Sequence, residues 1–550
     1  MNSERFDTHE VLNQAPPLVD IDLFRGDPAL AEAVSREGGE WAVPGLQVLG
    51  AKAGSAEVLA LGPLANANPP VLRAFDRYGR RQDRVEFHPA WHELLAILCA
   101  EGVHASPWAE SRPGAHVARA ARFVMMNRVE AGSLCPVTMT FGSVPAIRRD
   151  PEIAAAWLPK VLSRRYDPGF RPASEKTGCL VGMGMTEKQG GSDVRANATQ
   201  AEPIAGTDRA YTLVGHKWFF SAPMCDAFLV TAQAPSGLAC FFVPRWMPEG
   251  DLNRLRLQRL KDKLGNRSNA SSEVEFHGAW GLRLGEEGRG IPTIIEMATY
   301  TRLDCALGTT ALMRQAVAEA VHHARHRTVF QKRLGDQPLM RNVLADMALE
   351  VEAAMALTFR LARAFDAEAD EGEAALRRLL TPAAKYWVCK RGPMLAAEAM
   401  EVLGGNGYVE EHGLARIYRE MPVNSIWEGS GNIMSLDMLR AAGRSPDALA
   451  ALRAELGLSR GGDTRLDRFV AALEGEMADA TEAESRARRL AERLVLAVQG
   501  SLLVRYAPSA VADAFCASRL SGESGRAFGI LPAGLDLGPI IERANPTSEA

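Results

Sequence analysis

The residue whose setting could do chemistry most directly is a glutamate between a bulky aromatic side chain and a glycine-rich turn, in the stretch WEGSGN at 427–432. A dry, aromatic setting raises the pKa of a carboxylate toward the range useful for a general base. The start of a helix opposes that shift, because it favours the anion. On its own, Glu428 is therefore better interpreted as a capping or surface acid than as a catalyst.

Three other stretches are dense in glycine, aromatic or polar residues: GMGMTEKQGGSDV at 182–194, GHKWFFS at 215–221 and LGGNGY at 403–408. Glycines let the backbone approach a ligand, and neighbouring N–H groups and hydroxyls can bind phosphate or polar ring atoms. Each stretch also has a plain structural interpretation, respectively as a domain-junction turn, a core strand and a helix C-cap. No single stretch is decisive.

The elements that must position these residues change type along the chain. Residues 1–45 look like an irregular lead-in, and the spacing of apolar residues over 50–170 is mainly helical. Short β-rich runs bounded by Gly, Asp, Ser and Pro predict a small antiparallel β domain after that. Helical segments then follow, at 304–328, 338–366, 374–403 and 431–442.

Short connections between those four segments suggest a helical bundle. A further stretch is helical in pattern but rich in loops near its end. We therefore predict four regions: a helical domain with its lead-in at 1–180, a β domain at 181–290, a four-helix bundle at 291–443 and a helical appendage at 444–550.

Composition is that of an ordinary globular protein, with 47% hydrophobic and 24% charged residues among 550. The net charge of -4 gives no global attraction to nucleic acid or anionic lipid. No apolar run approaches the ~18 residues that span a bilayer, and the N-terminus does not resemble a secretory signal. The eight cysteines are scattered without a CxxC motif. We expect buried free thiols in a reducing, cytoplasmic setting.

Taken together and in this order, the four stretches resemble the acyl-CoA dehydrogenase family over about residues 115–442. The resemblance is closer to one branch, the AidB proteins of the bacterial adaptive response to DNA alkylation. It rests there on FHPAWH, EAGSLCPVTMTF, LKDKLGNRSNAS and EMPVNSIWEGSGNIM, at 87–92, 130–141, 260–271 and 420–434. The implied fold is α+β and multidomain: an N-terminal α domain, a middle antiparallel β-barrel, a C-terminal four-helix bundle and an extra C-terminal helical domain.

The resemblance implies an FAD-dependent oxidoreductase acting on CH–CH bonds, with Glu428 as the base that removes the α-proton of an acyl thioester. It places these residues against the cofactor: Met183, Met185, Thr186, Gly191, Ser192, Trp218, Phe219, Phe220, Ser221, Ile426, Trp427, Gly429, Ser430, Gly431 and Asn432. It also implies a homotetramer, a dimer of dimers, in which the adenine half is held by the neighbour's Arg327, Phe330, Gly404 and Gly405. Departures at Gln331, Gln337 and Glu401 leave those adenine contacts open.

The substrate is less defined than the flavin. Arg302 occupies the place of a family arginine near the substrate, and Asp304 follows two residues later. The extra carboxylate either repels CoA phosphates or restricts the pocket, or it simply pairs with Arg302. Our hypothesis is that any acyl-CoA turnover is slow and isovaleryl-CoA-like.

The AidB resemblance also implies DNA binding and protection against alkylation damage. Residues 441–550 contain 13 Arg and no Lys against 15 Asp plus Glu, a net charge of 13 − 15 = −2, which is no overall footprint for DNA. A local stripe at Arg486, Arg488 and Arg489 could contact the phosphates of double-stranded DNA. The alternative is an ordinary short- or branched-chain acyl-CoA dehydrogenase without a DNA role.

Histidines at metal-compatible spacing occur twice, as His88 with His92 and as His322, His323 and His326. No third ligand accompanies the first pair, and the resemblance brings no metal. We interpret both groups as structural and expect no metal site.

Overall fold

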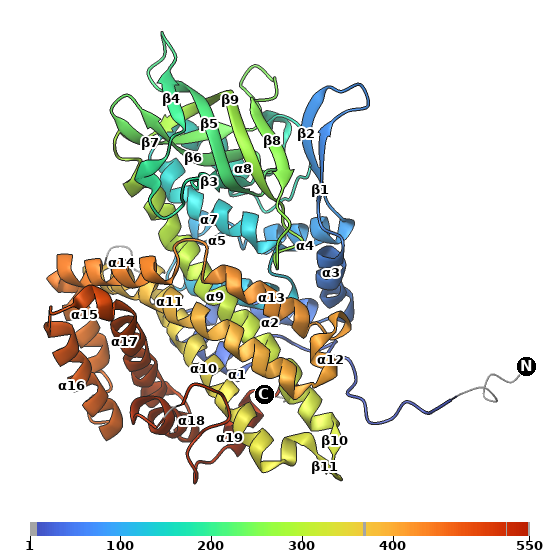
Figure 1. The fold of residues 1–550 in the computed structure, drawn as a ribbon, viewed down its shortest axis with the longest axis vertical. Helices are drawn as coiled ribbons and strands as arrows, with labels where there is room; N and C mark the ends of the chain where they lie inside the picture. The colour runs from blue at the N-terminus through green and yellow to red at the C-terminus, as the bar shows by residue number, and fades with distance from the viewer. Residues whose placement is uncertain (1–7, 367–369, 524, 548–550) are drawn as a thin grey trace, which may run out of the picture.

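The computed structural model describes residues 8–366, 370–523 and 525–547. A β domain lies at one end of the molecule and a mass of helices at the other, with the C-terminal helices packed along one flank (Figure 1). Hydrophobic residues from all these parts form one continuous buried core. The arrangement holds the segments at 182–221 and 426–432 on either side of the junction between the sheet and the helices.

The N-terminal region is helical, with one hairpin inserted. Its helices are α1 Pro28–Arg36, α2 Val43–Ala53, α3 Ala56–Ala67, α4 Pro89–Ala100, α5 Ser106–Ala109, α6 Ala115–Val129, α7 Leu134–Arg148 and α8 Pro151–Val161. Our expectation of an irregular lead-in was wrong from α1 onward, because Asp27 caps that helix and Pro28 suits its first turn. The expectation of mainly helical structure over 50–170 did not include the antiparallel pair β1 Val71–Phe75 and β2 Arg81–Glu86.

The β domain is closed on itself. Its strands are β3 Val181–Gly184, β4 Gln200–Pro203, β5 Ala210–Ser221, β6 Ala227–Ala234, β7 Gly237–Pro244, β8 Leu255–Leu260 and β9 Ser271–Leu284. The order is β3-β5-β4-β6-β7-β9-β8, and the added β5–β9 pairing completes a ring through β9, β7, β6 and β4. Closure pairs the strand edges and fixes the long strand β5, whose last residues face the helices.

The first bundle helix starts at Gly290, beside the predicted bundle boundary at 291 and earlier than the helical segment expected at 304–328. The bundle comprises α9 Gly290–His326, α10 Pro338–Asp366, α11 Glu371–Val402, α12 Gly405–Tyr408, α13 Leu414–Asn424 and α14 Gly431–Arg444, with the short pair β10 Thr328–Val329 and β11 Lys332–Arg333 between α9 and α10. Helix α9 packs on α6, α7, α10 and α11, so it forms the axis of the helical part. Glu428 lies in the turn between α13 and α14.

The C-terminal region contains α15 Pro446–Gly457, α16 Thr464–Ala478, α17 Ala483–Tyr506, α18 Ser509–Phe515 and α19 Gly538–Arg543. Helix α17 packs against α10, α11 and α14, so this region is joined to the bundle along its length. All eight cysteines are buried and unpaired. Within the described residues, no single helix is long and apolar enough to cross a membrane, although Glu40–Ala53 and Ala56–Ala67, bent by 62°, reach that length and apolarity together.

Candidate active site

The turn that carries Glu428 is conformationally strained. Glu428 has φ +58 and the following Gly429 has φ +104. A Cβ added to Gly429 would lie 2.5 Å from the Cε atom of Met434, so this position needs glycine on two grounds. A non-glycine residue at positive φ is costly and tends to persist at functional sites. The strain therefore marks this turn as a candidate for chemistry.

The carboxyl group of Glu428 is buried, although the residue as a whole is only half-buried. Its Oε2 atom has no hydrogen-bond partner among the described residues. Burial raises the pKa of the Glu428 carboxyl above its usual value, and a hydrogen bond from Thr301 opposes that shift only in part. The positive charges of Arg302 and Lys385 also act to lower it. The group is thus a desolvated carboxyl with one oxygen free to act.

Two cations fix the backbone of this turn rather than the carboxylate. Arg302 Nε donates to the Glu428 carbonyl oxygen at 3.0 Å, and Lys385 Nζ donates to the Gly429 carbonyl oxygen at 2.7 Å. Both cations come from long bundle helices, α9 and α11. The carbonyl groups of the strained turn are therefore satisfied, while the carboxyl end of Glu428 stays free.

The pairing of Arg302 with Asp304 that the sequence suggested is wrong. Arg302 Nη1 pairs instead with Asp437 on α14 at 3.0 Å. Asp304 receives a two-pronged contact from Arg119 at 2.5 and 2.7 Å and a hydrogen bond from Thr138 at 2.8 Å. On a helix, residues two apart point in different directions, so Arg302 and Asp304 each pair with a residue of another element. Asp304 is consequently neutralised by a buried arginine.

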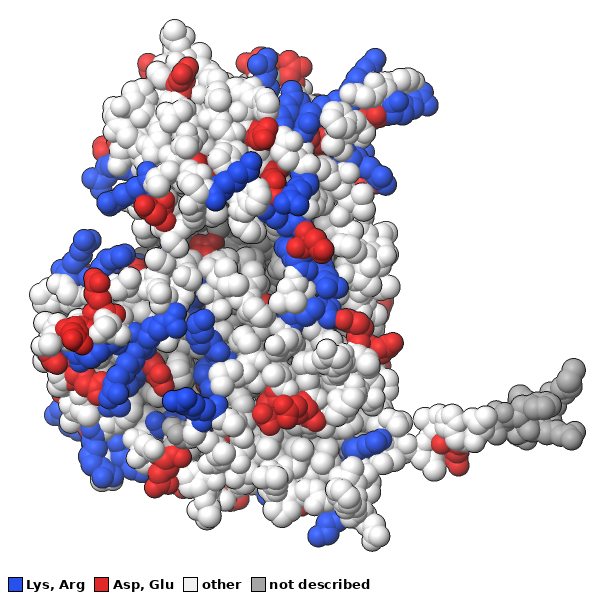
Figure 2. Space-filling view, in the orientation of Figure 1, with Lys and Arg blue, Asp and Glu red and all other residues white. Residues whose placement is uncertain are grey.

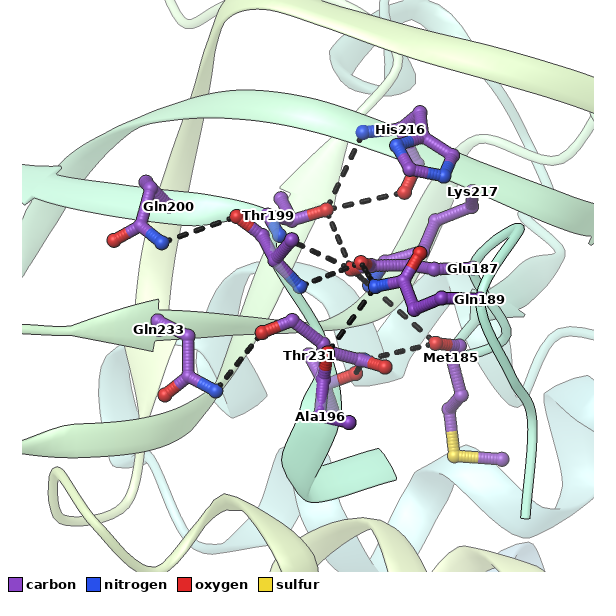
Figure 3. Close-up of polar contacts among 12 residues, drawn as sticks. Met185, Glu187, Gln189, Ala196, Thr199, Gln200, His216, Lys217, Thr231 and Gln233 are labelled. Atoms are coloured by element: carbon purple, nitrogen blue, oxygen red, sulfur yellow. Dashed lines mark hydrogen bonds and ion pairs between the residues drawn. The ribbon is translucent and has the colours of Figure 1, made fainter. Parts of the chain in front are cut away.

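A buried polar cluster holds the glycine-rich loop at 185–192 to strand β5 (Figure 3). Lys217 Nζ lies 2.7 Å from Glu187 Oε1, and neither side chain is exposed to solvent. Glu187 also accepts hydrogen bonds from the Thr199 hydroxyl at 2.6 Å and from the Ala198 N–H at 2.6 Å. Burial alone would raise the pKa of the Glu187 carboxyl, but Lys217 and these donors lower it to about 2. Burial lowers the pKa of Lys217, and its ion pair with Glu187 opposes that shift.

The same cluster fixes the backbone of the loop. Asn197 Nδ2 donates to the Met185 carbonyl oxygen at 2.9 Å, and the Trp218 N–H donates to the Thr186 carbonyl oxygen at 2.8 Å. Loop and strand are therefore in register at the point where Met185, Thr186 and Trp218 present their side chains. Met185, Thr186 and Trp218 thus form one wall of the site, and this wall is preorganised for a flat ligand.

The aromatic triplet of β5 splits between two environments. Trp218 is half-buried with Lys261 Nζ 3.2 Å from its ring centroid, and Phe219 is 49% exposed. Phe220 is fully buried and packs on Phe228 with ring centroids 4.3 Å apart. The pairing of β5 with β9 shifts register between Lys217 and Phe220, and Phe220 lies in the buried core of the barrel beside Phe228 and Phe276. The expected contact of Phe220 with the cofactor stays a prediction.

Cys135, at the start of α7, links the two sides of the site. Its thiol lies near Ser221 at the end of β5, near Asn269, and close enough to Glu428 and Lys263 for their charges to affect its pKa. Burial raises the pKa of this thiol to about 12, so it stays neutral. Ser221 and Glu428 therefore both lie near Cys135. Cys135, Lys263 and Asn269 were not predicted as site residues. The stretches that contain them, at 130–141 and 260–271, gave only a family resemblance.

The remaining residues expected on this side lie around the same junction. Met183 pairs with Ser221 across β3 and β5. Gly191 and Ser192 are exposed on the loop, where a Cβ on Gly191 would lie 2.8 Å from the Thr186 hydroxyl. Ile426 is 64% exposed beside the turn. Trp427 is half-buried with an unpartnered Nε1, Ser430 and Asn432 are exposed, and Gly431 is buried at the first residue of α14.

The four residues expected to hold the adenine half are not brought to Glu428 within one chain. Arg302 lies within α9 and Arg327 follows its last residue, and the 25 residues of helix between them span about 37 Å. Phe330, just past that helix, is 94% exposed with φ +49. Gly404 and Gly405 are exposed at the start of α12. Their distance from the turn agrees with a contribution to a neighbour's site.

The arginine stripe of α17 is mostly occupied by acids of its own region. Arg486 pairs with Asp479 at 3.4 Å, and Arg489 pairs with Glu476 at 3.0 Å. Arg488 instead points toward the active-site turn, where its Nε donates to Asn432 Oδ1 at 2.8 Å. The three side chains thus do not form one free cationic surface.

The histidines have structural partners. His88 caps α4 by accepting from the Ala90 N–H, His92 contacts the Tyr166 hydroxyl at 2.8 Å, and His322 contacts the Pro16 carbonyl oxygen at 2.8 Å. Over the described residues, no group of three or more His, Cys, Asp or Glu side chains is arranged to hold a metal ion.

The surface is hollowed where the β domain meets the helices (Figure 2). Three family models match the chain: the adaptive response protein AidB N-terminal domain at residues 13–168, the acyl-CoA dehydrogenase middle domain at 182–279, and the acyl-CoA dehydrogenase C-terminal domain at 288–443. The two latter matches meet at this junction, on the elements that carry the wall and the turn.

Individual proteins match over nearly the whole chain. The AidB protein of Escherichia coli (strain K12) is 52% identical over 520 residues, covering 94% of this chain and 95% of its own. The crystal structure of Caenorhabditis elegans ACDH-11 in complex with C11-CoA is similar with a TM-score of 0.84 at 26% identity, covering 100% of this chain and 95% of that one. The apo form of Bd2924 gives 0.83 at 30% identity, covering 91% and 100%.

Proposed function

The chain belongs to the acyl-CoA dehydrogenase family, in its AidB branch, and from this premise we propose that Glu428 removes the α-proton of an acyl thioester in a flavin-dependent desaturation. The expected fold, with helical, β and helical domains in that order, is confirmed. FAD as cofactor and the class of oxidoreductase acting on CH–CH bonds follow from family membership. The observation that carries the role of Glu428 is its buried, unpartnered Oε2 on a strained turn.

The residues present fit FAD. A flat ring system needs an apolar wall with polar atoms at its edge, and Trp218, half-exposed Phe219 and the fixed loop at 185–192 supply one. The unpartnered Nε1 of Trp427 and the exposed Ser430 lie across the junction from that wall. We propose that these residues hold the isoalloxazine and its side chain.

The chain's own residues prepare the proton transfer. When bound, FAD supplies the two-electron oxidant that accepts the β-hydride of the substrate. The Cα–H bond breaks toward a Glu428 oxygen, the electron pair forms the Cα–Cβ double bond, and the products are an enoyl thioester and a protonated Glu428. Desolvation makes the carboxylate a stronger base, while Arg302 and Lys385 hold its backbone in place.

The buried pair of Arg119 and Asp304 supports a short acyl group as substrate. Asp304 lies one turn along α9 from Thr301, the residue that contacts Glu428, so both face the same side of the helix. A charged pair with a Thr138 contact is a poor lining for a long alkyl chain, because a disturbed pair would leave a buried charge unsatisfied. We infer slow turnover that is best with short, branched chains such as isovaleryl.

The test is a turnover assay with an artificial electron acceptor over acyl-CoA thioesters of increasing chain length, using protein of measured FAD content. We expect slow turnover, greatest with isovaleryl-CoA and falling with longer chains, and an α,β-unsaturated product by mass spectrometry. Rapid turnover of long-chain substrates would contradict the assignment of substrate class. Protein that carries FAD but desaturates no thioester would contradict the proposed reaction.

A role in the response to DNA alkylation is proposed as a second function. Its support is the match of residues 13–168 to the AidB N-terminal domain. Binding of duplex DNA through Arg486, Arg488 and Arg489 has weaker support, because two of these side chains are already paired with acids. Gel shifts at several salt concentrations, with wild type and the triple alanine variant, test this surface. Equal binding by both proteins would remove it from consideration.

We also propose that the chain forms a homotetramer, a dimer of dimers, in which Arg327 and Phe330 complete a neighbour's cofactor site. The 94% exposure of Phe330 and the 81% exposure of Tyr408 in α12 support an interface at this end of the helical part. Multi-angle light scattering should give four chains per particle, and Phe330→Ala should weaken FAD binding. A monomeric particle that retains FAD would contradict the proposal.

A further inference from the structure

The turn after Glu428 is closed from behind by the C-terminal region. Gly431 is the first residue of α14 and is buried. A Cβ on it would lie 3.2 Å from Lys390 Cε and 3.4 Å from Arg488 Nη2. Arg488 Nε donates to Asn432 Oδ1 at 2.8 Å. Side chains from α11 and α17 therefore meet at a turn that the family's own catalytic domain supplies.

This meeting point is positively charged for two reasons, the uncapped start of α14 and two basic side chains. Ser430, the N-cap of α14, makes no side-chain capping bond, so the first N–H groups of the helix lack that partner. The helix N-terminus adds a partial positive charge. The Lys390 and Arg488 side chains are exposed beside it.

Arg488 differs from its neighbours on α17. Arg486, Arg489 and Arg493 each pair with an acidic side chain, Asp479 or Glu476. Within the described part of the chain, the Arg488 guanidinium forms no ion pair, and its hydrogen bond goes to a neutral amide. That amide orients the guanidinium and leaves its charge and most of its donors available. A forked, uncompensated cation at a helix N-terminus is suited to a phosphate group.

We propose that Arg488, assisted by Lys390, binds the diphosphate of FAD, so that the C-terminal region completes the cofactor site. The inference rests on the flavin site proposed above, which puts the turn at 429–432 against the cofactor. It assigns Arg488 to the cofactor rather than to DNA. A Cβ at Gly431 would press on the end of the Lys390 side chain and touch Arg488, so a larger residue there would crowd both cations.

The experiment measures the affinity of apo-protein for FAD and for riboflavin, which has no phosphate, by flavin fluorescence. Variants are Arg488→Ala, Arg488→Gln, Arg488→Lys and the control Arg489→Ala, whose side chain pairs with Glu476 on the same helix. We expect Arg488→Ala and Arg488→Gln to raise the Kd for FAD about tenfold or more, since a charge-assisted contact is lost. Arg488→Lys should recover part of the affinity. Arg489→Ala should bind FAD as wild type does, and riboflavin affinity should be the same in all variants.

Equal FAD affinity of Arg488→Gln and wild type would overturn the proposal. So would an equal loss for FAD and riboflavin, because the arginine would then act only on the shape of the turn. Arg488→Gln keeps a polar group beside Asn432, so it replaces Arg488→Ala if the alanine variant does not fold. Failure of wild type to bind FAD would instead contradict the flavin site itself. Loss of duplex binding without loss of FAD affinity would assign Arg488 to DNA.

Discussion

Two glutamates on opposite sides of one junction have opposite environments. Glu187 in the β domain has Lys217, Thr199 and a backbone N–H within hydrogen-bonding distance, and the pKa of its carboxyl falls to about 2. Glu428 at the turn has a buried oxygen without a partner, a positive φ and a raised pKa. Full hydrogen bonding makes a buried carboxylate structural, while an unsatisfied one is held at a cost that chemistry can use. The hydrogen bonds of Glu187 therefore stabilise the β domain, while Glu428 keeps an oxygen available for proton transfer.

The largest expected effect is on Glu428. Glu428→Gln keeps the shape of the side chain and removes the base, so turnover of isovaleryl-CoA should fall by about 10²–10⁴-fold, as expected for lost general-base catalysis. FAD content should not change. The assay is dye-linked turnover, with Glu202→Gln on the exposed side of β4 as the control. Undiminished turnover in Glu428→Gln would show that Glu428 is not the base, and the contrast with Glu187 would then have no functional meaning.

Removing the partner of the other glutamate should affect stability first. Lys217→Met leaves Glu187 buried and uncompensated, so we expect the free energy of unfolding to fall by about 3–5 kcal/mol in urea titrations. The double variant Glu187→Gln with Lys217→Met should recover part of that loss, because no unpaired charge remains. A loss below about 1 kcal/mol in the single variant would show that solvent reaches the pair.

The strained turn should show a smaller cost. Gly429→Ala places a Cβ at φ +104 and 2.5 Å from Met434 Cε, so we expect a loss of about 1–3 kcal/mol in stability together with reduced turnover. Gly443→Ala in α14 is the matched control, since nothing lies within 4 Å of the added Cβ. That helical change should be neutral or slightly stabilising. If Gly429→Ala behaves like Gly443→Ala, the turn is not strained in solution.

The smallest effect is on the pH dependence of turnover. Glu428 acts as a base only when ionised, and its pKa is raised by burial, so kcat/KM should fall as pH drops through a midpoint above that of an ordinary glutamate. Glu187, whose pKa is lowered, stays ionised over the same range. The profile of kcat/KM against pH in wild type measures this midpoint. A midpoint at or below about 4.3, the usual value for glutamate, would place Glu428 in a solvated setting.

The sequence predicted the four segments around the junction because each motif is local. Glycine spacing, an aromatic run and a carboxylate between Trp427 and Gly429 are visible without knowing which helices touch. The wider order of helical, β and helical domains followed from periodicity and from the family resemblance. The hairpin at 71–86 and the helix after Asp27 were missed, because short elements within a helical or irregular pattern give weak signals.

Pairings between residues far apart in the chain could not be predicted from the sequence. Asp304 meets Arg119, 185 residues away, only because α9 packs on α6, and the nearer Arg302 turns to α14. Arg488 could be seen only as one of three arginines until the fold placed it beside Asn432, 56 residues earlier. Phe220 could be grouped with Trp218 and Phe219 only by its aromatic type until the fold placed it in the core of the barrel. In each case helix or strand orientation, rather than residue type, decides the contact.

The most direct test of the account is anaerobic mixing of the FAD-loaded protein with isovaleryl-CoA, followed by the visible absorbance of the flavin. We predict slow bleaching in wild type, with one enoyl thioester formed per flavin reduced, and no bleaching in Glu428→Gln that carries the same amount of FAD. Bleaching at the same rate in both proteins would contradict the claim that Glu428 removes the α-proton at this flavin.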